Sequence, residues 1–521
     1  MRSAAARVLC PANEKVWILA ATILASSMAF IDSTVVNVAL PAIQASFHAT
    51  VIGVQWVVES YGLFLAALIL VGGSLGDLFG RRLLFVVGVA TFAVASLICG
   101  IASGITSLIV ARSVQGVGAA LLVPGSLAII SVSFEEQERG QAIGTWSGFT
   151  AITTAVGPVL GGWLVEHASW RWAFFINVPL AAAVIIISLR YIPESRSSAA
   201  SQIDWLGALL AVAGLGGLVT GLIESAKLGW RDVLVPGMLI AGLGCLILFL
   251  LVEAHVSSPM VPLTIFAPRS FSGANLLTLF LYGAIGIFFF LFPLNLIQVQ
   301  KYSATATGAA VLPLILLMFF LSRWSGGLVA RYGPRSPLII GPLIVALGFL
   351  FFAVPATNAD YWKAFFPAVI VLGFGMAVTV APLTTVVMNS VPQDRVGAAS
   401  GINNAVARLA SVLAIAIFGV VMVREFGSRL DYNLREMALP PAVLQELQTN
   451  EIKLAGLQAP PGLPSSMAAA IDESIRRAFV FGFRIVMYLC AILSLVSAGV
   501  AWLMIRDHPT NGLRPDSPLR T

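Results

Sequence analysis

Apolar runs long enough to cross a lipid bilayer recur fourteen times along this sequence. Each is close to the length of about 20 residues that a helix needs to span the hydrocarbon core. A helix of this kind satisfies its backbone hydrogen bonds internally, so it is stable without water around it. The sequence therefore predicts an all-α polytopic membrane protein with fourteen transmembrane helices. The runs cover residues 16–40, 54–75, 83–103, 106–131, 141–165, 172–190, 205–224, 234–253, 271–299, 304–329, 337–355, 362–390, 396–423 and 479–505.

The composition excludes a water-soluble enzyme. Only 10% of the residues are charged, against about 25% in soluble domains, and the mean hydropathy is +0.94. The four cysteines and four histidines show no spacing typical of a disulfide framework or a zinc site. The net charge of +6 arises from Lys and Arg spread among the predicted loops, so nucleic acid is not an expected partner. We expect no catalytic residues, no metal and no cofactor.

Positive charges indicate which helix ends face the cytoplasm. The first run has no clear cleavage site after it, and we interpret it as a retained helix rather than a signal peptide. With the N-terminus inside, the predicted cytoplasmic segments carry fifteen Lys and Arg residues and the short outer loops carry five. Positive residues are enriched on the cytoplasmic side of membrane proteins. The sequence therefore predicts a cytoplasmic (inner) membrane protein with both termini in the cytoplasm.

Two similar segments indicate an internal duplication. GSLGDLFGRR at 73–82 resembles GGLVARYGPR at 326–335, at an offset of 253 residues. Two six-helix halves account for only part of this offset, and two further helices fill the remainder. The predicted organisation is an N-terminal six-helix bundle at 1–203, two inserted transmembrane helices at 204–254, and a C-terminal six-helix bundle at 255–521 with a long extracytoplasmic loop at 424–478.

Parallel repeats of this kind are typical of secondary transporters, which bind substrate between the two halves near the membrane midplane. A channel would instead show rings of polar residues or a filter loop. The sequence contains no GxxxxGK[ST] phosphate-binding loop, so the energy must come from an ion gradient or a separate subunit. One charge crossing 100 mV provides about 2.3 kcal/mol. We therefore predict a transporter driven by the proton gradient.

Three ionisable residues lie within predicted helices of the N-terminal half, namely Asp32, Glu59 and Arg112. At 1.5 Å per residue all three are roughly 8 to 12 Å below the outer surface, so we expect one charge cluster. A charged Asp32 in lipid costs about 2.5–3.5 kcal/mol, so it must face a cavity, pair with Arg112 or be protonated. An aspartate that alternates between pairing and protonation carries protons. The alternatives are a fixed ion pair that orients two helices and, for Glu59, hydration near the surface.

The C-terminal half has no acidic residue deep within a predicted helix. Arg408 lies near mid-depth of the run at 396–423, and we interpret it as a structural partner rather than a substrate contact. Glu224 and Glu253 stand at the ends of the inserted helices and are expected at the membrane interface.

The motifs resemble those of a known family over nearly the whole chain. IDSTVVNVALP at 31–41, GSLGDLFGRR at 73–82 and LIVARSVQGVGAA at 108–120 are together similar to the major facilitator superfamily, in its fourteen-span drug:proton antiporter branch. The resemblance implies a major facilitator fold and export of hydrophobic or cationic drug-like compounds by alternating access. Protons, membrane lipid and small substrates are the implied partners.

The resemblance also implies a conformational latch, which holds the two halves together on the cytoplasmic side in the outward-facing state. Asp77 is expected to accept hydrogen bonds from a helix N-terminus, where anions are favoured, and the glycines to permit a tight turn. The alternative is a loop kept only for its positive charge. The latch residues are Gly73, Asp77, Gly80, Arg81 and Arg82.

The predicted fifth helix, GTWSGFTAITTAVGPVLGGWLVE at 144–166, resembles a motif of antiporters rather than symporters. Small residues let helices approach closely, and proline removes one backbone donor, so this helix is expected to bend without leaking ions. Its matching residues are Gly144, Gly157, Pro158, Gly161 and Gly162. In WRWAFFINVP at 170–179, Trp170 and Trp172 are expected in the interfacial aromatic belt.

Aromatic and amide side chains are candidates to line a substrate cavity between the halves. Aromatic faces suit flat hydrophobic or cationic compounds, whereas packing between helices is the alternative for each. The candidates are Trp56, Tyr61, Trp146, Phe149, Asn295, Gln298, Asn403 and Asn404.

The outer loop at 424–478 has two diproline pairs that bracket a predicted short amphipathic helix, and Ser465 or Ser466 is expected to cap the next helix. A gate, a partner-binding segment and a tolerated insertion are the alternatives for its role, and a periplasmic adaptor is an open alternative as a partner. For the whole chain, an exporter or flippase of a specific lipid or secondary metabolite is the alternative function. An uptake symporter or a sensor is disfavoured by the fifth-helix motif.

Overall fold

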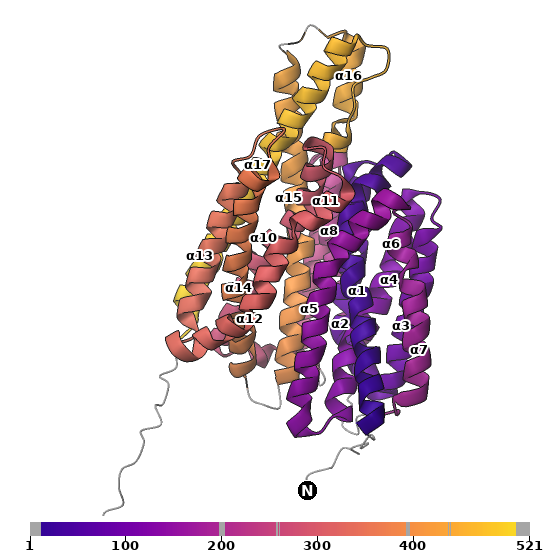
Figure 1. Ribbon diagram of the computed structural model, residues 1–521, viewed down its shortest axis with the longest axis vertical. Helices are drawn as coiled ribbons and strands as arrows, with labels where there is room; N and C mark the ends of the chain where they lie inside the picture. Colours follow the sequence, from indigo (N-terminus) through magenta and orange to yellow (C-terminus); the bar gives the residue numbers. More distant parts are fainter. Residues whose placement is uncertain are drawn as a thin grey trace, which may run out of the picture.

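The computed structural model describes residues 12–196, 204–256, 259, 261–391, 396–435, 437 and 439–506. Throughout these ranges every regular element is a helix (Figure 1). The predicted all-α class is therefore confirmed. In the predicted orientation, the end of the molecule that carries α16 is the outer end.

Thirteen helices of the described ranges are long and apolar enough to cross a membrane. The remaining predicted run, 141–165, lies in α5 (Glu136–His167). With 32 residues and a rise of 1.5 Å per residue, α5 is about 48 Å long, which exceeds the membrane core of about 30 Å. It packs along α1 (Ala12–Phe47). The chain is a multi-pass membrane protein.

The first seven helices pack mainly against one another, and we call them the N-terminal bundle (Figure 1, indigo to purple). The most extensive contact joins α2 and α4, where a Cβ added to Gly116 would meet the backbone oxygen of Tyr61. Such backbone-to-backbone contact fixes the relative rotation of the two helices. Besides α1 and α5, the bundle contains α2 (Val51–Phe79), α3 (Arg81–Gly100), α4 (Ile105–Ser133), α6 (Trp172–Phe175) and α7 (Asn177–Tyr191).

The C-terminal bundle is built around stacked phenylalanines. The ring centroids of Phe288 and Phe352 are 4.7 Å apart, and those of Phe288 and Phe292 are 4.9 Å apart. This bundle contains η1 (Leu263–Phe266), α10 (Arg269–Leu294), η2 (Asn295–Val299), α11 (Ala304–Ala310), α12 (Leu312–Tyr332), α13 (Arg335–Phe352), η3 (Tyr361–Phe365), α14 (Phe366–Asn389), α15 (Val396–Arg435), α16 (Pro441–Thr449), η5 (Glu451–Gly456) and α17 (Ser465–Met504).

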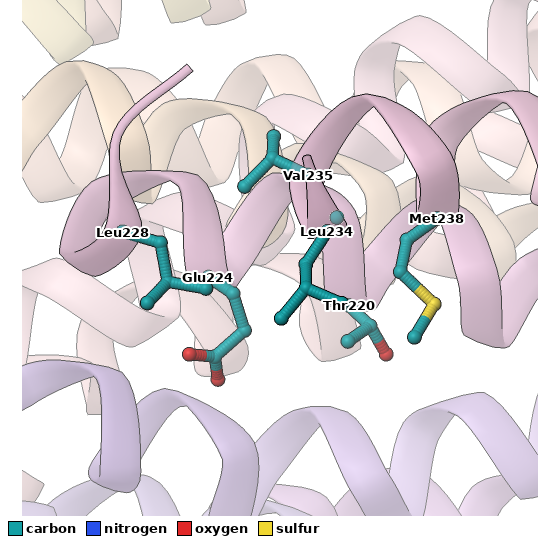
Figure 2. Close-up of a pocket in the computed structure, with 7 residues that line it drawn as sticks. Thr220, Glu224, Leu228, Leu234, Val235 and Met238 are labelled. Carbon is teal, nitrogen blue, oxygen red and sulfur yellow. The ribbon is translucent and has the colours of Figure 1, made fainter. Parts of the chain in front are cut away.

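The two inserted helices are α8 (Trp205–Leu228) and α9 (Leu234–His255). Helix α8 packs against α2 and α15, so it touches both bundles, whereas α9 packs mainly against α8 and is largely exposed. A small pocket of about 80 Å³ lies between α8 and α9, with Glu224 and Met238 in its wall (Figure 2). The pair therefore covers the lateral seam between α2 and α15.

The predicted long outer loop is largely helical. Helices α15 and α17 each have 40 residues, twice what the membrane core requires, and their outer ends project beyond the rest of the molecule together with α16 (Figure 1). The hydropathy window ends the run at 423 because charged residues enter the helix there, although the helix continues. The expected short helix is α16, but the residue that caps α17 is Pro464 and no serine side chain does so.

Candidate functional site

Asp32 of α1 and Arg112 of α4 form a buried ion pair. The distance between Arg112 Nη1 and Asp32 Oδ2 is 2.5 Å, and the two side chains are 1% and 0% exposed. Two charges without water are stable in protein only when the pair is well aligned and further hydrogen bonds satisfy the remaining atoms. The predicted meeting of these two residues is present in the structure.

Three neutral side chains complete the surroundings of Asp32. Gln115, one turn after Arg112, donates from Nε2 to Asp32 Oδ1 at 2.8 Å and accepts from Arg112 Nη1 at 2.6 Å. Asn177 of α7 donates to Asp32 Oδ1 at 3.3 Å, and Ser96 of α3 accepts from Gln115 at 2.7 Å. Sequence reasoning missed all three. The i, i+3 spacing from Arg112 was a usable signal for Gln115, but Ser96 and Asn177 are brought in by packing.

Arg112 is held from its other side by α2. Its Nε donates to the backbone oxygen of Val57 at 3.1 Å, and its guanidinium lies 4.2 Å from the ring centroid of Tyr61, a cation–π contact. Tyr61, a candidate for the substrate cavity, is only 4% exposed. Its hydroxyl has no hydrogen-bond partner in the described part of the chain.

Glu59 does not join this network. Its side chain is 0% exposed, and neither carboxylate oxygen has a hydrogen-bond partner within the described ranges. The expectation of a single three-residue cluster is therefore not met. Surface hydration of Glu59 is also absent in this conformation, because the residue lies on the α2 face that carries Gln55 and Gly62, both of which contact α15.

The glycines of α5 contact two different neighbours, α1 and the C-terminal bundle. Added Cβ atoms at Gly157 and Gly161 would overlap Thr34 and Val35 of α1, within the N-terminal bundle. A Cβ at Gly162 would overlap the backbone of Ala304 in the C-terminal bundle.

A reciprocal contact joins Gly308 of α11 to the Pro158 carbonyl. Gly144 has open space around it. The outer part of α5 is thus a backbone-level contact between the bundles.

Further contacts close the outer end. Glu166 accepts from the backbone amide of Thr305 at 3.1 Å. Gln44 of α1 accepts from Gln298 at 2.8 Å and donates to the Lys453 oxygen at 3.1 Å. Lys453 belongs to η5, so this element contacts α1. These contacts show that the two bundles meet at the predicted outer end.

Among the described residues, the hydrogen-bond and ion-pair partners of the predicted latch loop all belong to the N-terminal bundle or to the segment that directly follows α7. Asp77 pairs with Arg81, with 2.7 Å between Oδ1 and Nη2. The expected acceptor role at a helix N-terminus belongs to another residue, Glu194. Its carboxylate accepts from the backbone amides of Arg82 and Leu83 at 3.1 Å each.

Glycine is required at position 80, before α3. Gly80 has φ +125, a region that other residues rarely adopt, and an added Cβ would overlap Glu194. At Gly73, another of the predicted latch residues, an added Cβ would lie 3.8 Å from the Pro124 side chain, which is ordinary van der Waals contact. Gly80 and Glu194, which are far apart in sequence, are thus in contact at the start of α3.

Replacing Glu194 by Gln should destabilise the protein by about 1 kcal/mol, because the neutral amide loses the favourable interaction of an anion with the N-terminal end of α3. The midpoint of thermal unfolding in detergent measures this effect. Glu446→Gln, an exposed acid on α16, is the matched control. Equal midpoints for the two variants would contradict the capping role.

The other cavity candidates are dispersed. Trp56 donates to Glu224 of α8 at 3.1 Å, so its indole faces the inserted helices. Trp146 donates to Ser26 at 3.1 Å within the N-terminal bundle. Phe149 is exposed.

The amide candidates are mostly engaged in local contacts. Asn295 is buried and accepts from Gln300, and Gln298 belongs to the outer closure described above. Asn403 donates to Asn275 and Thr278 of α10. Asn404 alone of the four amides is exposed.

Three further expectations concern residues near helix ends. Trp172 is exposed as expected of the aromatic belt, but Trp170 is buried and stacks under Arg171 at 4.3 Å. Glu224 is partly buried, whereas Glu253 is buried, at 3% exposure, and accepts from the backbone amide of Val261. Trp170 and Glu253 are therefore enclosed by protein, whereas Trp172 faces outward.

Comparison with known proteins agrees with this architecture. A protein-family model described as Major Facilitator Superfamily matches residues 22–415. A solved structure of a bacterial homolog to the human lysosomal transporter Spinster, in an inward-facing and occupied conformation, has a TM-score of 0.64. It shares 18% sequence identity and covers 96% of this chain and 98% of its own. That likeness shows the fold.

Curated relatives share more of the sequence. "Multidrug resistance protein Stp" of Mycobacterium tuberculosis is 37% identical over 432 residues, which cover 82% of this chain and 79% of that protein. "Tetracenomycin C resistance and export protein" of Streptomyces glaucescens is 32% identical over 498 residues, or 94% of this chain and 92% of that protein. The similarity therefore extends over both bundles.

Proposed function

Since this chain belongs to the major facilitator superfamily, within its drug-efflux branch, we propose that it is a proton-coupled antiporter that exports hydrophobic drug-like compounds across the cytoplasmic membrane by alternating access. Both relatives above are named for drug resistance, and one for export. These names support drug export over the alternative of a dedicated lipid or metabolite flippase.

The observation that carries the proposal is the buried Asp32–Arg112 pair. A carboxylate in this position is the proton-binding group, because protonation removes the charge that Arg112 balances. Arg112 keeps three other contacts, with the Val57 oxygen, Gln115 and the Tyr61 ring. The pair can therefore dissociate without leaving the guanidinium wholly unsatisfied.

Asn177 supports the protonated state. Its Oδ1 is buried and has no hydrogen-bond partner in the described ranges, although its Nδ2 already donates to Asp32. Rotation of the amide presents this oxygen to a protonated Asp32, which then donates instead of accepting. The same side chain thus serves both protonation states.

The structure has the two bundles in contact at the outer end, and we assign it to the inward-facing half of the cycle. Outward opening then requires α5 to separate from α11 and α2 from α15. In that state we propose that the loop at 73–82 contacts the C-terminal bundle as a latch. Glu59 is the second proposed titrating group, because an unpaired buried carboxylate is costly unless it is neutral and separation of α2 from α15 would hydrate it.

Transport by reconstituted vesicles tests the function. Protein in vesicles with an imposed pH gradient and no ATP should accumulate tetracenomycin C or puromycin, and a protonophore should reduce accumulation to that of empty vesicles. Proteins named for resistance to these two drugs are among the relatives of this chain. Accumulation that is unaffected by the protonophore would refute proton coupling.

A further inference from the structure

Arg408 of α15 is a cation without an anion. Among the residues that the structure describes it forms no ion pair and donates no hydrogen bond. It is only partly buried. The sequence-based interpretation of Arg408 as a structural partner is therefore unsupported, since none of the described residues provides a counter-ion.

The position of Arg408 places it between the bundles. Leu70 of α2 lies beside Gly401, and Val412 of α15 lies beside Gly62. Arg408 is seven residues after the first contact and four before the second, so it falls on the same face of α15. That face is turned toward α2 and the N-terminal bundle.

Tyr61 provides an independent observation at the same place. Its hydroxyl is buried and has no hydrogen-bond partner in the described ranges. The ring is fixed by its contact with Arg112 and by the close approach of Gly116 to its backbone. Since Gly62 follows Tyr61 and contacts Val412, one turn after Arg408, a donor without an acceptor and a cation without an anion lie at the same α2–α15 interface.

Neither acidic residue of this region offers a free anion to a cationic cargo. Asp32 is fully buried, and both of its oxygens are occupied by Arg112, Gln115 and Asn177. Glu59 is fully buried without a hydrogen-bond partner in the described ranges, where a free anion is costly. The uncompensated charge at this interface is therefore that of Arg408, which does not favour an organic cation.

We propose that Arg408 and the Tyr61 hydroxyl form a cargo subsite for a hydrophobic anion, such as an aromatic carboxylate or an ionised phenol. This inference rests on the proposed export function and names its substrate class. An anionic oxygen satisfies both donors at once, and a guanidinium binds carboxylates through parallel hydrogen bonds. Exposed Asn404, one turn earlier on α15, lies on the side from which cargo enters the inward-facing state.

Equilibrium binding of three pyrene probes tests the subsite. We use 1-pyrenebutyric acid, 1-pyrenebutanol and 1-pyrenemethylamine with the full-length protein in detergent, and measure energy transfer from tryptophan to pyrene. The acid should bind more tightly than the amine. Arg408→Leu should weaken binding of the acid by about tenfold to hundredfold, as expected for a lost charge-assisted interaction, and leave binding of the alcohol unchanged.

Two conservative variants and one control separate the site from folding. Arg408→Lys should retain part of the affinity, and Tyr61→Phe should lower it several-fold while keeping the ring on Arg112. Arg424→Leu removes the same charge from an exposed position of the same helix and should bind the acid as the parent protein does. Tighter binding of the amine, or unchanged binding of the acid by Arg408→Leu, overturns the proposal.

Competition distinguishes cargo from lipid. Phosphatidylglycerol and phosphatidylcholine are each added as competitors of the bound acid. If only phosphatidylglycerol displaces the acid, the subsite binds a lipid headgroup and the cargo assignment is overturned. The binding assay uses no gradient, so it is independent of the transport assay. Binding that depends on Arg408, without proton-driven transport, would refute the proposed function and leave the subsite standing. Proton-driven transport, with tighter binding of the amine than of the acid, would support the proposed function and refute the subsite.

Discussion

Asp32→Asn is expected to lower pH-gradient-driven export by more than about a hundredfold while the protein still folds. Asparagine has nearly the same shape and still accepts a hydrogen bond from Arg112, but it does not titrate. The vesicle assay measures the loss, as the initial rate of drug accumulation at several imposed pH differences. Retained dependence on the pH gradient would remove Asp32 from the mechanism.

Loss of folding must be separated from loss of coupling, because a buried charge without its partner destabilises a protein by about 3–5 kcal/mol. The double variant Asp32→Asn, Arg112→Gln removes both charges and should unfold at a higher temperature than the single variant. It should transport no better. Asp431→Asn, outside the membrane on α15 and bonded to Gln448, is the control and should transport normally.

Gly162→Val is expected to reduce export at least tenfold by preventing closure of the outer end. The added side chain overlaps the backbone of Ala304, so α5 and α11 must separate. Overpacking costs about 1–3 kcal/mol, and the conformational states of a protein differ by only a few kcal/mol. The substitution therefore shifts the population toward the outward-facing state and blocks the cycle.

Disulfide crosslinking reports this shift directly. Gln44→Cys and Gln298→Cys introduce thiols at side chains that are hydrogen-bonded across the outer end, and the rate at which they crosslink should fall in Gly162→Val. Gly144→Val, on the same helix but surrounded by open space, should crosslink and transport as the parent does. Normal crosslinking and export by Gly162→Val would show that the contact does not limit the cycle.

Some of the site was predictable from sequence because depth in a membrane is a local property. Hydropathy locates each helix, and the rise per residue then places Asp32 and Arg112 at similar depths. Opposite charges at equal depth in an apolar medium are driven to pair. The same arithmetic failed for Glu59, since depth does not specify the direction in which a side chain points around its helix.

The remaining features depend on which helices are neighbours, and residue order does not encode this. Gln115 and Asn177 reach Asp32 only because α4 and α7 both pack against α1. Gly161 and Gly162 are adjacent in sequence yet contact different bundles, since successive residues point about 100° apart around a helix. Glu194 caps α3 from more than a hundred residues away.

Hydropathy and motifs alone thus predicted an all-helical membrane transporter in which Asp32 and Arg112 meet, because lipid imposes its requirements residue by residue. Tertiary packing decided the partners of each polar group. In the part of the chain that the structure describes, neutral amides enclose Asp32, Glu59 has no hydrogen-bond partner, and Arg408 faces α2 without a counter-ion. Rotation about each helix axis and the identity of its neighbours determine these contacts, and only the folded chain specifies both.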